Sequence, residues 1–408
     1  MRVALVTYGL HVGGMESFLL MLAEELRAKG MQVSFVITEK IGAWHRLAVE
    51  KGFKAIVVRP SPWRTRRWHA SQVAAELQEF DAVLLNHSAA AQPVLGELPA
   101  NCLIMALLHN DQESIYRVGL SNLGNLDYLV CVGSKILSEA KRLGAAPSQA
   151  VHIPYGVNVS TTWPKEHVST QTGRPLKVIF VGRVDHEQKG VLDLPLILAE
   201  ARRLGVKTTF EVVGDGEPDL TTLRNKFAAI LPDLQVVYHG KKDNMDALQL
   251  LGQADILLMP SRFEGLPVTL LEAIARGVVP VASFLPGITD DAVTNGVNGL
   301  LPTVGDISGF ARAIARLQDD NLRLQMSRAA WQEARDKFNK ELMVDRYLRL
   351  LHSPCTKKVR SCREVDSIGR VLFGLGWSVP VGLTKTASAI RKRRFLVVIQ
   401  RLMRRYAH

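Results

Sequence analysis

Two glutamates, Glu264 and Glu272, lie eight positions apart in the segment EGLPVTLLEA, around a proline and an apolar run. Pro267 suits the first turn of a helix, because the N–H that it lacks would have no helical partner there, and Gly277 suits the C-terminal stop. The run before them, DILLMPS (255–261), is typical of a buried strand. The pattern predicts strand, loop and helix, with Glu264 in the loop and Glu272 more than a turn into the helix.

The N-terminus of this helix would be a phosphate site. Free N–H groups near Leu266, Val268 and Thr269 belong to the first turn, where the helix favours anions. Two carboxylates beside a phosphate make sense if they bind hydroxyl groups on either side of it. One would hold a sugar and the other a ribose, which is the geometry of a nucleotide sugar. A solvated loop residue and an ordinary helix-face residue are the plainer alternative.

Apolar runs that alternate with longer amphipathic stretches must position these groups. The predicted strands of the first part are 3–8, 33–38, 54–59, 82–86, 103–109 and 128–133. Those of the second part are 177–183, 209–217, 235–240, 255–261, 278–283 and 299–302. This alternation predicts an α/β protein with two doubly wound, Rossmann-like domains that face across a cleft, and ligands at the carboxyl ends of the strands.

A segment rich in Pro, Gly, Ser and Thr (153–175) separates the two sets of strands and is typical of a linker. We predict an N-terminal domain, a linker, a C-terminal domain and a basic amphipathic tail, over 1–160, 161–175, 176–350 and 351–408. Because both domains would end before the tail, we expect removal of 353–408 to leave the fold intact.

The net charge of +12 is concentrated at the C-terminus, since residues 353–408 hold 13 Lys and Arg but only 2 Asp and Glu. The segment RPSPWRTRRWHA (59–70) also combines arginines with tryptophans. Both patterns favour an anionic membrane surface, although 59–70 also fits an ordinary solvated loop. The tail could bind nucleic acid, but no recognition-motif spacing supports that, and we predict no nucleic-acid partner.

The remaining bulk features are plain. No uncharged apolar run is long enough to span a membrane, and the N-terminus shows no cleavage pattern of a secretion signal. The four cysteines form no CxxC and have no zinc spacing, which suits reduced thiols in the cytoplasm. We therefore predict a cytoplasmic protein, peripheral on the inner face of the cytoplasmic membrane.

The segment PSRFEGLPVTLLEAIARGVVPVAS (260–283) strongly resembles the signature of the large retaining glycosyltransferase family 4, which has the GT-B fold. The resemblance extends over roughly residues 1–345. It also includes four shorter motifs: GGME (13–16), IPYGVN (153–158), VGR (181–183) followed by KG (189–190), and VVGDGE (212–217).

This resemblance implies roles for the matched residues. Arg183 and Lys189 would stabilise the leaving diphosphate, and Glu264 would hold the donor sugar. His109, after the apolar run LIMALLH, would line the reaction centre, with His87 as the rival candidate. The family often has Asp directly after this histidine, whereas Asn110 follows here and Asp111 comes second. The implied donor-binding residues are Gly13, Gly14, Gly214, Gly265, Leu266, Val268 and Glu272.

The implied activity is transfer of a sugar, with retention, from a nucleotide-diphosphate sugar to a hydroxyl of a glycan or lipid-linked acceptor. The first domain would be on the acceptor side, and the setting would be cell-surface polysaccharide or glycolipid synthesis. A UDP-sugar is favoured, with GDP-mannose as the alternative. We predict no metal site, and no cofactor besides the donor substrate.

Three other functions stay open at this point. The chain could epimerise or hydrolyse such a donor, although relatives that do so lack the Glu-x7-Glu helix. It could also be a non-catalytic homologue that is held to membranes. A nicotinamide dehydrogenase is disfavoured, because no G-x-G-x-x-G fingerprint is present.

Overall fold

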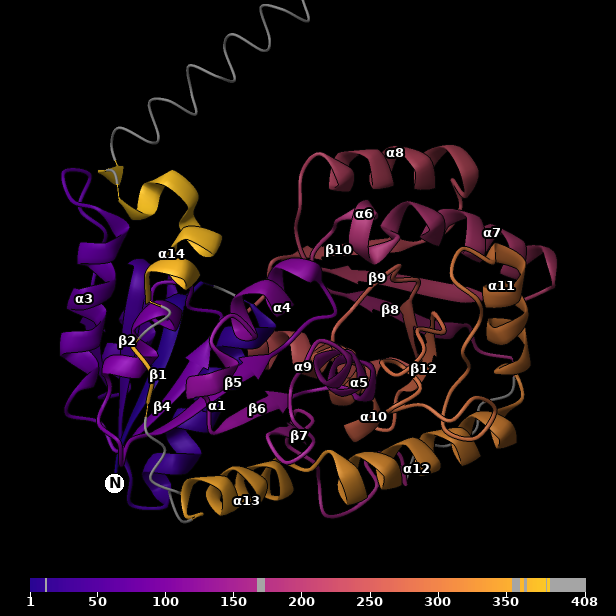
Figure 1. Ribbon diagram of the computed structural model, residues 1–408. Coiled ribbons are helices and arrows are strands. Elements are labelled where there is room, and N and C mark those ends of the chain that lie inside the picture. The colour runs from indigo at the N-terminus through magenta and orange to yellow at the C-terminus, as the bar shows by residue number, and fades with distance from the viewer. Residues whose placement is uncertain (12, 167–172, 354–359, 363–364, 379, 382–408) are drawn as a thin grey trace, which may run out of the picture.

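The computed structural model describes residues 1–11, 13–166, 173–353, 360–362, 365–378 and 380–381. It contains two parallel sheets, each covered by helices, that lie side by side (Figure 1). This arrangement confirms the predicted fold class of two Rossmann-like α/β domains.

The first sheet has seven strands in the order β3-β2-β1-β4-β5-β6-β7, and all neighbouring pairs are parallel. Its central strands are apolar and buried, because helices cover both faces. The short last strand was not predicted from the sequence. The strands are β1 (Arg2–Gly9), β2 (Gln32–Lys40), β3 (Lys54–Val57), β4 (Ala82–Asn86), β5 (Leu103–Leu108), β6 (Tyr128–Cys131) and β7 (Ala150–His152).

The second sheet has five parallel strands in the order β10-β9-β8-β11-β12. The predicted strand at 299–302 is wrong, since Leu300 makes only an isolated bridge to Val281. Gly299 likewise makes only an isolated bridge, to Asn295, so the run forms no continuous ladder with β12. The strands are β8 (Leu176–Val181), β9 (Thr208–Val213), β10 (Val236–Gly240), β11 (Ile256–Met259) and β12 (Val279–Ala282).

Helices fill the connections between the strands and continue beyond the second sheet. Those of the first part are α1 (Gly14–Ala28), α2 (Trp44–Glu50), α3 (Arg66–Leu77), α4 (Glu113–Gly119) and α5 (Ser134–Arg142). The second part has α6 (His186–Lys189), α7 (Leu194–Arg203), α8 (Asp219–Ile230), α9 (Asn244–Gln253), α10 (Val268–Ala275), α11 (Ile307–Arg316), α12 (Asp320–Lys337), α13 (Lys340–Leu351) and α14 (Val365–Phe373).

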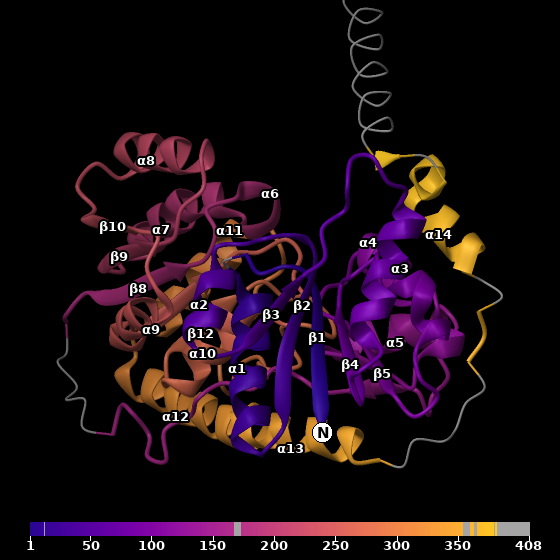
Figure 2. The same cartoon turned by 90° about the vertical axis from the view of Figure 1, so that its left-hand side faces the viewer.

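Helices α12 and α13 return the chain from the second domain to the first, along one side of the molecule (Figures 1 and 2). Lys340 of α13 forms an ion pair of 2.7 Å with Glu25 of α1, and Tyr347 and Met343 belong to the buried cluster that contains the core of the first domain. The predicted limits of the domains stay predictions, but α13 packs on the first domain although it follows the second in sequence.

The described part of the predicted tail also packs on the first domain. The Arg360 guanidinium donates to the carbonyls of Asn125 (2.7 Å) and Pro99 (3.3 Å), and its side chain is only 4% exposed. Trp377, which is 1% exposed, packs with Ala70 of α3. The expectation that removal of 353–408 leaves the fold untouched therefore needs correction, because it would empty these two sites. Residues 382–408 of the predicted tail lie outside the described residues.

Within the described ranges, no helix is both long enough and apolar enough to cross a membrane.

Candidate functional site

Helix α10 presents its N-terminus at the carboxyl end of β11, as the sequence predicts. Pro267 is the N-cap residue, one position before the first turn, and Gly277 follows the helix with φ of 66°. Glu264 precedes the helix and is only 6% exposed, so the loop does not leave it in solvent. Glu272 lies in the second turn and is partly buried. The two carboxylates therefore lie beside and behind one helix N-terminus.

The two basic residues that are predicted to bind the diphosphate, Lys189 and Arg183, lie near the loop that carries Glu264. The Nζ of Lys189 donates to Oε1 of Glu264 at 2.5 Å, and both side chains are largely buried. Arg183 donates to Oε1 of Gln188 at 2.7 Å, and Gln188 in turn donates to Oε2 of Glu264 at 3.3 Å. The Arg183 side chain is 62% exposed. The structure thus links Lys189 to Glu264 directly and Arg183 to Glu264 through Gln188, which the sequence reasoning missed.

Close packing of backbone explains the predicted glycine at the end of β9. Gly214 has φ of 143°, and an added Cβ would overlap the carbonyl oxygen of Gly182. The turn after β9 therefore lies directly against the turn after β8, which leads to Arg183. Any side chain at Gly214 would push these two turns apart.

On the opposite side, His109 follows β5 and is buried, with an exposure of 3%. Its Nδ1 lies 2.5 Å from the hydroxyl oxygen of Tyr155, and its Nε2 has no partner among the described residues. Burial, with a smaller contribution from the charge of His87, lowers the pKa of His109 to about 3. His109 is therefore neutral at physiological pH.

His87, the rival candidate, and Asp111, which stands one position later than the Asp of the family, both differ from His109 in their surroundings. His87 is only partly buried and has φ of 51°, the one positive value among the described non-glycine residues. Such a conformation is uncommon and is often found at functional sites. Asp111 accepts from the Tyr116 hydroxyl at 2.8 Å and pairs with Lys135 at 2.6 Å. Asp111, which departs from the family's His-Asp pattern, is therefore already bound to other side chains of the protein.

The two domains touch at the predicted site. Asn110 forms an antiparallel bridge with Gly265, and an added Cβ at Gly265 would overlap the carbonyl oxygen of His109. Gly13 is the N-cap of α1 and Gly14 its first residue, rather than part of a loop, and an added Cβ at Gly14 would lie 3.7 Å from Cγ2 of Val268 at the start of α10. The predicted glycine loop, helix N-terminus and histidine therefore meet at one place between the sheets.

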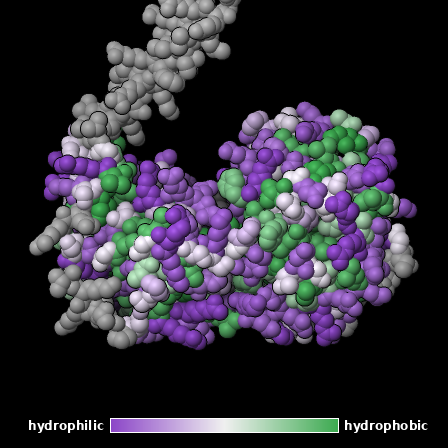
Figure 3. All heavy atoms as spheres, turned by 45° about the vertical axis from the view of Figure 1, so that its right-hand side comes forward, coloured by the Kyte–Doolittle hydropathy of each residue, from purple (hydrophilic) through white to green (hydrophobic). Residues whose placement is uncertain are grey.

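The molecular surface shows a notch between the two domains (Figure 3), and a cavity of about 760 Å³ is lined by residues of both domains. Val268 and Glu272 line it from the second domain, and Ser17 and Trp44 from the first. Burial raises the pKa of Glu272 to about 7, against a smaller opposing effect of Arg276. The lining combines three carboxylate and five basic side chains with apolar ones, which suits a ligand with both polar groups and an apolar ring.

Two further groups were not singled out from the sequence. Glu16 in the first turn of α1 is 8% exposed, and its burial raises its pKa. Arg262 lies 3.0 Å from Nε2 of His186 and 3.5 Å from Asp193. Arg262 could have been found from its place between β11 and Glu264. In the part of the chain that the structure describes, no cluster of His, Cys, Asp and Glu could hold a metal ion.

These two domains and their cleft define the GT-B class of folds. Anabaena HepE, solved in complex with UDP and glucose, superimposes with a TM-score of 0.71, covering 86% of this chain and 100% of HepE at 16% identity. The predicted GT-B fold is confirmed.

The sequence comparisons narrow this class. A model described as glycosyl transferases group 1 matches residues 175–320. The lipopolysaccharide core biosynthesis glycosyltransferase LpsE of Rhizobium meliloti is 31% identical over 244 residues, which are 58% of this chain and 68% of LpsE. The chain belongs to the glycosyl transferases group 1 family. Glycogen synthase of Mycobacterium tuberculosis is 30% identical over 216 residues. These residues are 52% of this chain and 51% of the synthase, so the chain matches only about half of that protein's length.

Proposed function

We propose that this protein transfers a sugar from a nucleotide-diphosphate sugar to a hydroxyl group of an acceptor. The observation that carries the proposal is the convergence of Lys189, Glu264 and the α10 N-terminus on the second domain with buried His109 on the first. A diphosphate would find two cations and free N–H groups there, and a sugar would find a carboxylate and an imidazole.

The charges support breakage of the bond between sugar and diphosphate. Negative charge grows on the leaving diphosphate, and Arg183, Lys189 and the helix N-terminus stabilise it. No carboxylate is assigned as a covalent nucleophile. The acceptor attacks the face that the diphosphate leaves, the leaving phosphate accepts the acceptor's proton, and the sugar keeps its anomeric configuration. This chemistry is proposed to proceed without a metal ion.

The donor is proposed to be a UDP-sugar. Support comes from HepE, which was solved with UDP and glucose and has the same fold. GDP-mannose is the alternative donor. The acceptor is proposed to be a glycan or lipid-linked sugar in the synthesis of a cell-surface polysaccharide or glycolipid, and the printed role of LpsE in lipopolysaccharide core biosynthesis supports this.

Donor-dependent release of nucleoside diphosphate tests the activity. A thermal-shift screen of UDP- and GDP-sugars first selects the donor, since a ligand at 100 times its dissociation constant adds about 2.7 kcal/mol. The selected donor is then supplied with and without glycan and lipid-linked acceptors. Acceptor-dependent release, and a product whose anomeric signal in NMR matches the donor, are expected. If the donor binds but no nucleoside diphosphate is released with any of the acceptors, the protein would be a binding protein and not an enzyme.

We also propose that the protein docks on the anionic inner face of the cytoplasmic membrane. Trp63 is 84% exposed, and the Arg64 guanidinium lies 5.5 Å from the ring centre of Trp68. One arginine of the same cluster, Arg66, is largely buried and pairs with Glu39, whereas Arg67 stays 63% exposed beside Asp366. The outward part of the cluster is therefore smaller than the sequence suggests.

Sedimentation with liposomes tests the membrane proposal. Binding to vesicles with anionic lipid, absent with neutral lipid and weakened by salt, is expected, because each basic residue near such a surface contributes about 1 kcal/mol. Trp63→Ser should reduce it, whereas the exposed Met245→Ser, on the second domain, is the matched control. Recovery in the supernatant under all conditions would contradict membrane docking and would favour a soluble acceptor.

A further inference from the structure

We propose that Tyr155 is a positioning residue that fixes which nitrogen of His109 carries the proton. The hydroxyl of Tyr155 donates to Nδ1, so that the proton of the neutral imidazole is held on Nε2. The consequence for catalysis rests on the proposed glycosyl transfer, but the tautomer itself does not.

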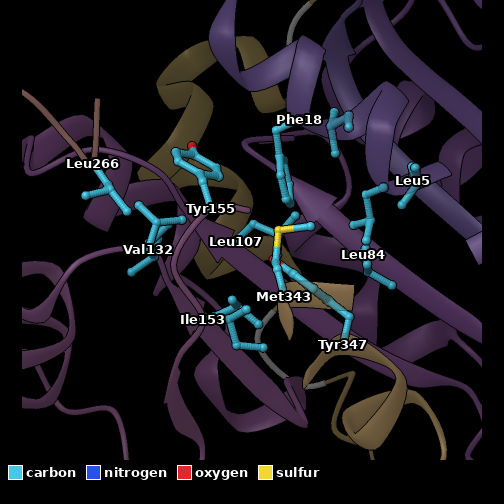
Figure 4. Close-up of a cluster of buried hydrophobic side chains, with 14 of the residues drawn as sticks. Leu5, Phe18, Leu84, Leu107, Val132, Ile153, Tyr155, Leu266, Met343 and Tyr347 are labelled. Atoms are coloured by element: carbon cyan, nitrogen blue, oxygen red, sulfur yellow. The ribbon is translucent and has the colours of Figure 1, made fainter. Parts of the chain in front are cut away.

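The two rings are held in one apolar stack. Tyr155 and His109 have ring centres 5.7 Å apart and planes only 7° from parallel, and Phe18 of α1 lies against both of them. Figure 4 shows Tyr155 between Leu266 of the second domain and Phe18 of the first. Because side chains from both domains enclose the pair, neither ring can turn without disturbing the core.

The direction of the hydrogen bond follows from the partners. Nδ1 of His109, at 2.5 Å, is the one hydrogen-bond partner shown for the Tyr155 hydroxyl within the described ranges. Burial holds the pKa of Tyr155 well above its ordinary value, so the hydroxyl keeps its proton. If the hydroxyl donates to Nδ1, only the Nε2–H is left without a partner, whereas if Nδ1–H donates, the hydroxyl proton and the Nε2 lone pair are both left without one. Nδ1 therefore carries no hydrogen.

The state of His109 then fixes the other nitrogen. Because its pKa is lowered to about 3, the ring holds a single proton, and with Nδ1 accepting, that proton is on Nε2. Nε2 is buried and has no partner among the residues that the structure describes. It is thus a preset N–H donor, which suits an oxygen of the donor sugar. The other tautomer would present a lone pair there instead.

A second buried tyrosine offers a matched control. Tyr347 of α13 also lies against Phe18, with ring centres 6.1 Å apart, and it is 0% exposed. Its hydroxyl has no partner within the described part of the chain. Tyr347→Phe removes the same atom from the same cluster without touching His109.

The test is 15N NMR of the free, histidine-labelled protein, with the His109 signals assigned by their loss in His109→Asn. The wild type is expected to show Nε2 protonated and Nδ1 as a hydrogen-bonded acceptor. Tyr155→Phe should shift the Nδ1 resonance and populate the second tautomer, whereas Tyr347→Phe should do neither. A wild type protonated on Nδ1, or an Nδ1 resonance unchanged in Tyr155→Phe, would overturn the assignment.

Kinetics add a second readout with the donor that the screen selects. Tyr155→Phe should lower kcat/KM about tenfold, as for one lost neutral hydrogen bond, and leave the Kd of the nucleoside diphosphate unchanged. An unchanged kcat/KM in an active enzyme would refute the positioning role. If no transfer is detected even in the wild type while the NMR result holds, the proposed function fails and the tautomer assignment stands.

Discussion

The two walls of the cleft are built in opposite ways. On the first domain, His109 is neutral, stacked and buried with Tyr155 and Phe18. On the second domain, Arg183 and Lys189 are charged and engaged with Gln188 and Glu264. The neutral wall is fixed before any ligand arrives, whereas the charged wall holds protein partners that a diphosphate would replace or share. This difference suggests that the first domain sets geometry and the second supplies charge.

The two cations of the charged wall should differ in what their loss costs. Lys189→Ala and Arg183→Ala are both expected to lower turnover on the order of 10²-fold or more, because each removes charge from the leaving diphosphate. Lys189→Ala should also lower the melting temperature, since it leaves Glu264 buried without its cation. Arg183→Ala should leave the melting temperature unchanged, because the Arg183 side chain is 62% exposed.

Diphosphate release and thermal unfolding of both variants measure this contrast. Arg203→Ala is the control, as its guanidinium pairs with Glu200 on the surface of α7, away from the site. Near-normal turnover in both site variants would remove the cations from the mechanism, and complete loss of wild-type activity with a chelator would contradict metal independence.

Contact between the walls can be tested with two glycines. Gly265→Ala is expected to lower turnover by about 10- to 100-fold and to destabilise the protein by about 1–3 kcal/mol, because its Cβ would overlap the His109 carbonyl. In Gly14→Ala the added Cβ would lie 3.7 Å from Val268, an ordinary contact distance, so turnover and stability should change far less. Steady-state kinetics and urea unfolding compare them, and equal effects would show that the domains do not need this contact.

Glu272 should make nucleotide binding depend on pH. In the proposed role, its carboxylate is the form that would accept hydrogen bonds from ribose hydroxyls, and burial raises its pKa to about 7. Binding must remove a proton below that pH, so affinity for the nucleoside diphosphate should rise about tenfold between pH 6 and 8.

Glu272→Gln should weaken the nucleotide about tenfold at pH 8, because a neutral acceptor replaces a charged one. It should also flatten the pH dependence. Calorimetry at several pH values measures both effects. A Glu272→Gln profile parallel to that of the wild type would assign the titration to another group and remove the ribose role.

The truncations at the C-terminus should differ in cost. Removal of 382–408 should cost less than removal of 353–408, because the buried contacts of Arg360 and Trp377 stay in the shorter truncation. Removal of 353–408 should cost several kcal/mol, as a fully buried tryptophan and a buried arginine are lost together. Urea unfolding distinguishes them, and equal stability of both truncations would show that the packing of 360–381 contributes nothing.

Local patterns predicted much of this molecule, and long-range contacts account for most of what they missed. The apolar runs marked eleven of the twelve strands, and the Glu-x7-Glu helix and its glycines were placed correctly along the chain. The prediction of a strand at 299–302 failed because Gly299 and Leu300 make only isolated bridges, although Leu300 and Leu301 are buried. Tyr155 and His109 are 46 residues apart, and Arg360 lies 235 residues from Asn125, so no period in the sequence links them.

The division between the walls is tested most directly by calorimetry with the selected nucleotide sugar and with its nucleoside diphosphate alone. Arg183→Ala and His109→Ala are compared with the wild type, after their melting temperatures show that both are folded. If the second domain supplies charge and the first sets the sugar, Arg183→Ala weakens both ligands, whereas His109→Ala weakens only the nucleotide sugar. Unchanged binding in Arg183→Ala, or equal weakening of both ligands in His109→Ala, would contradict the account.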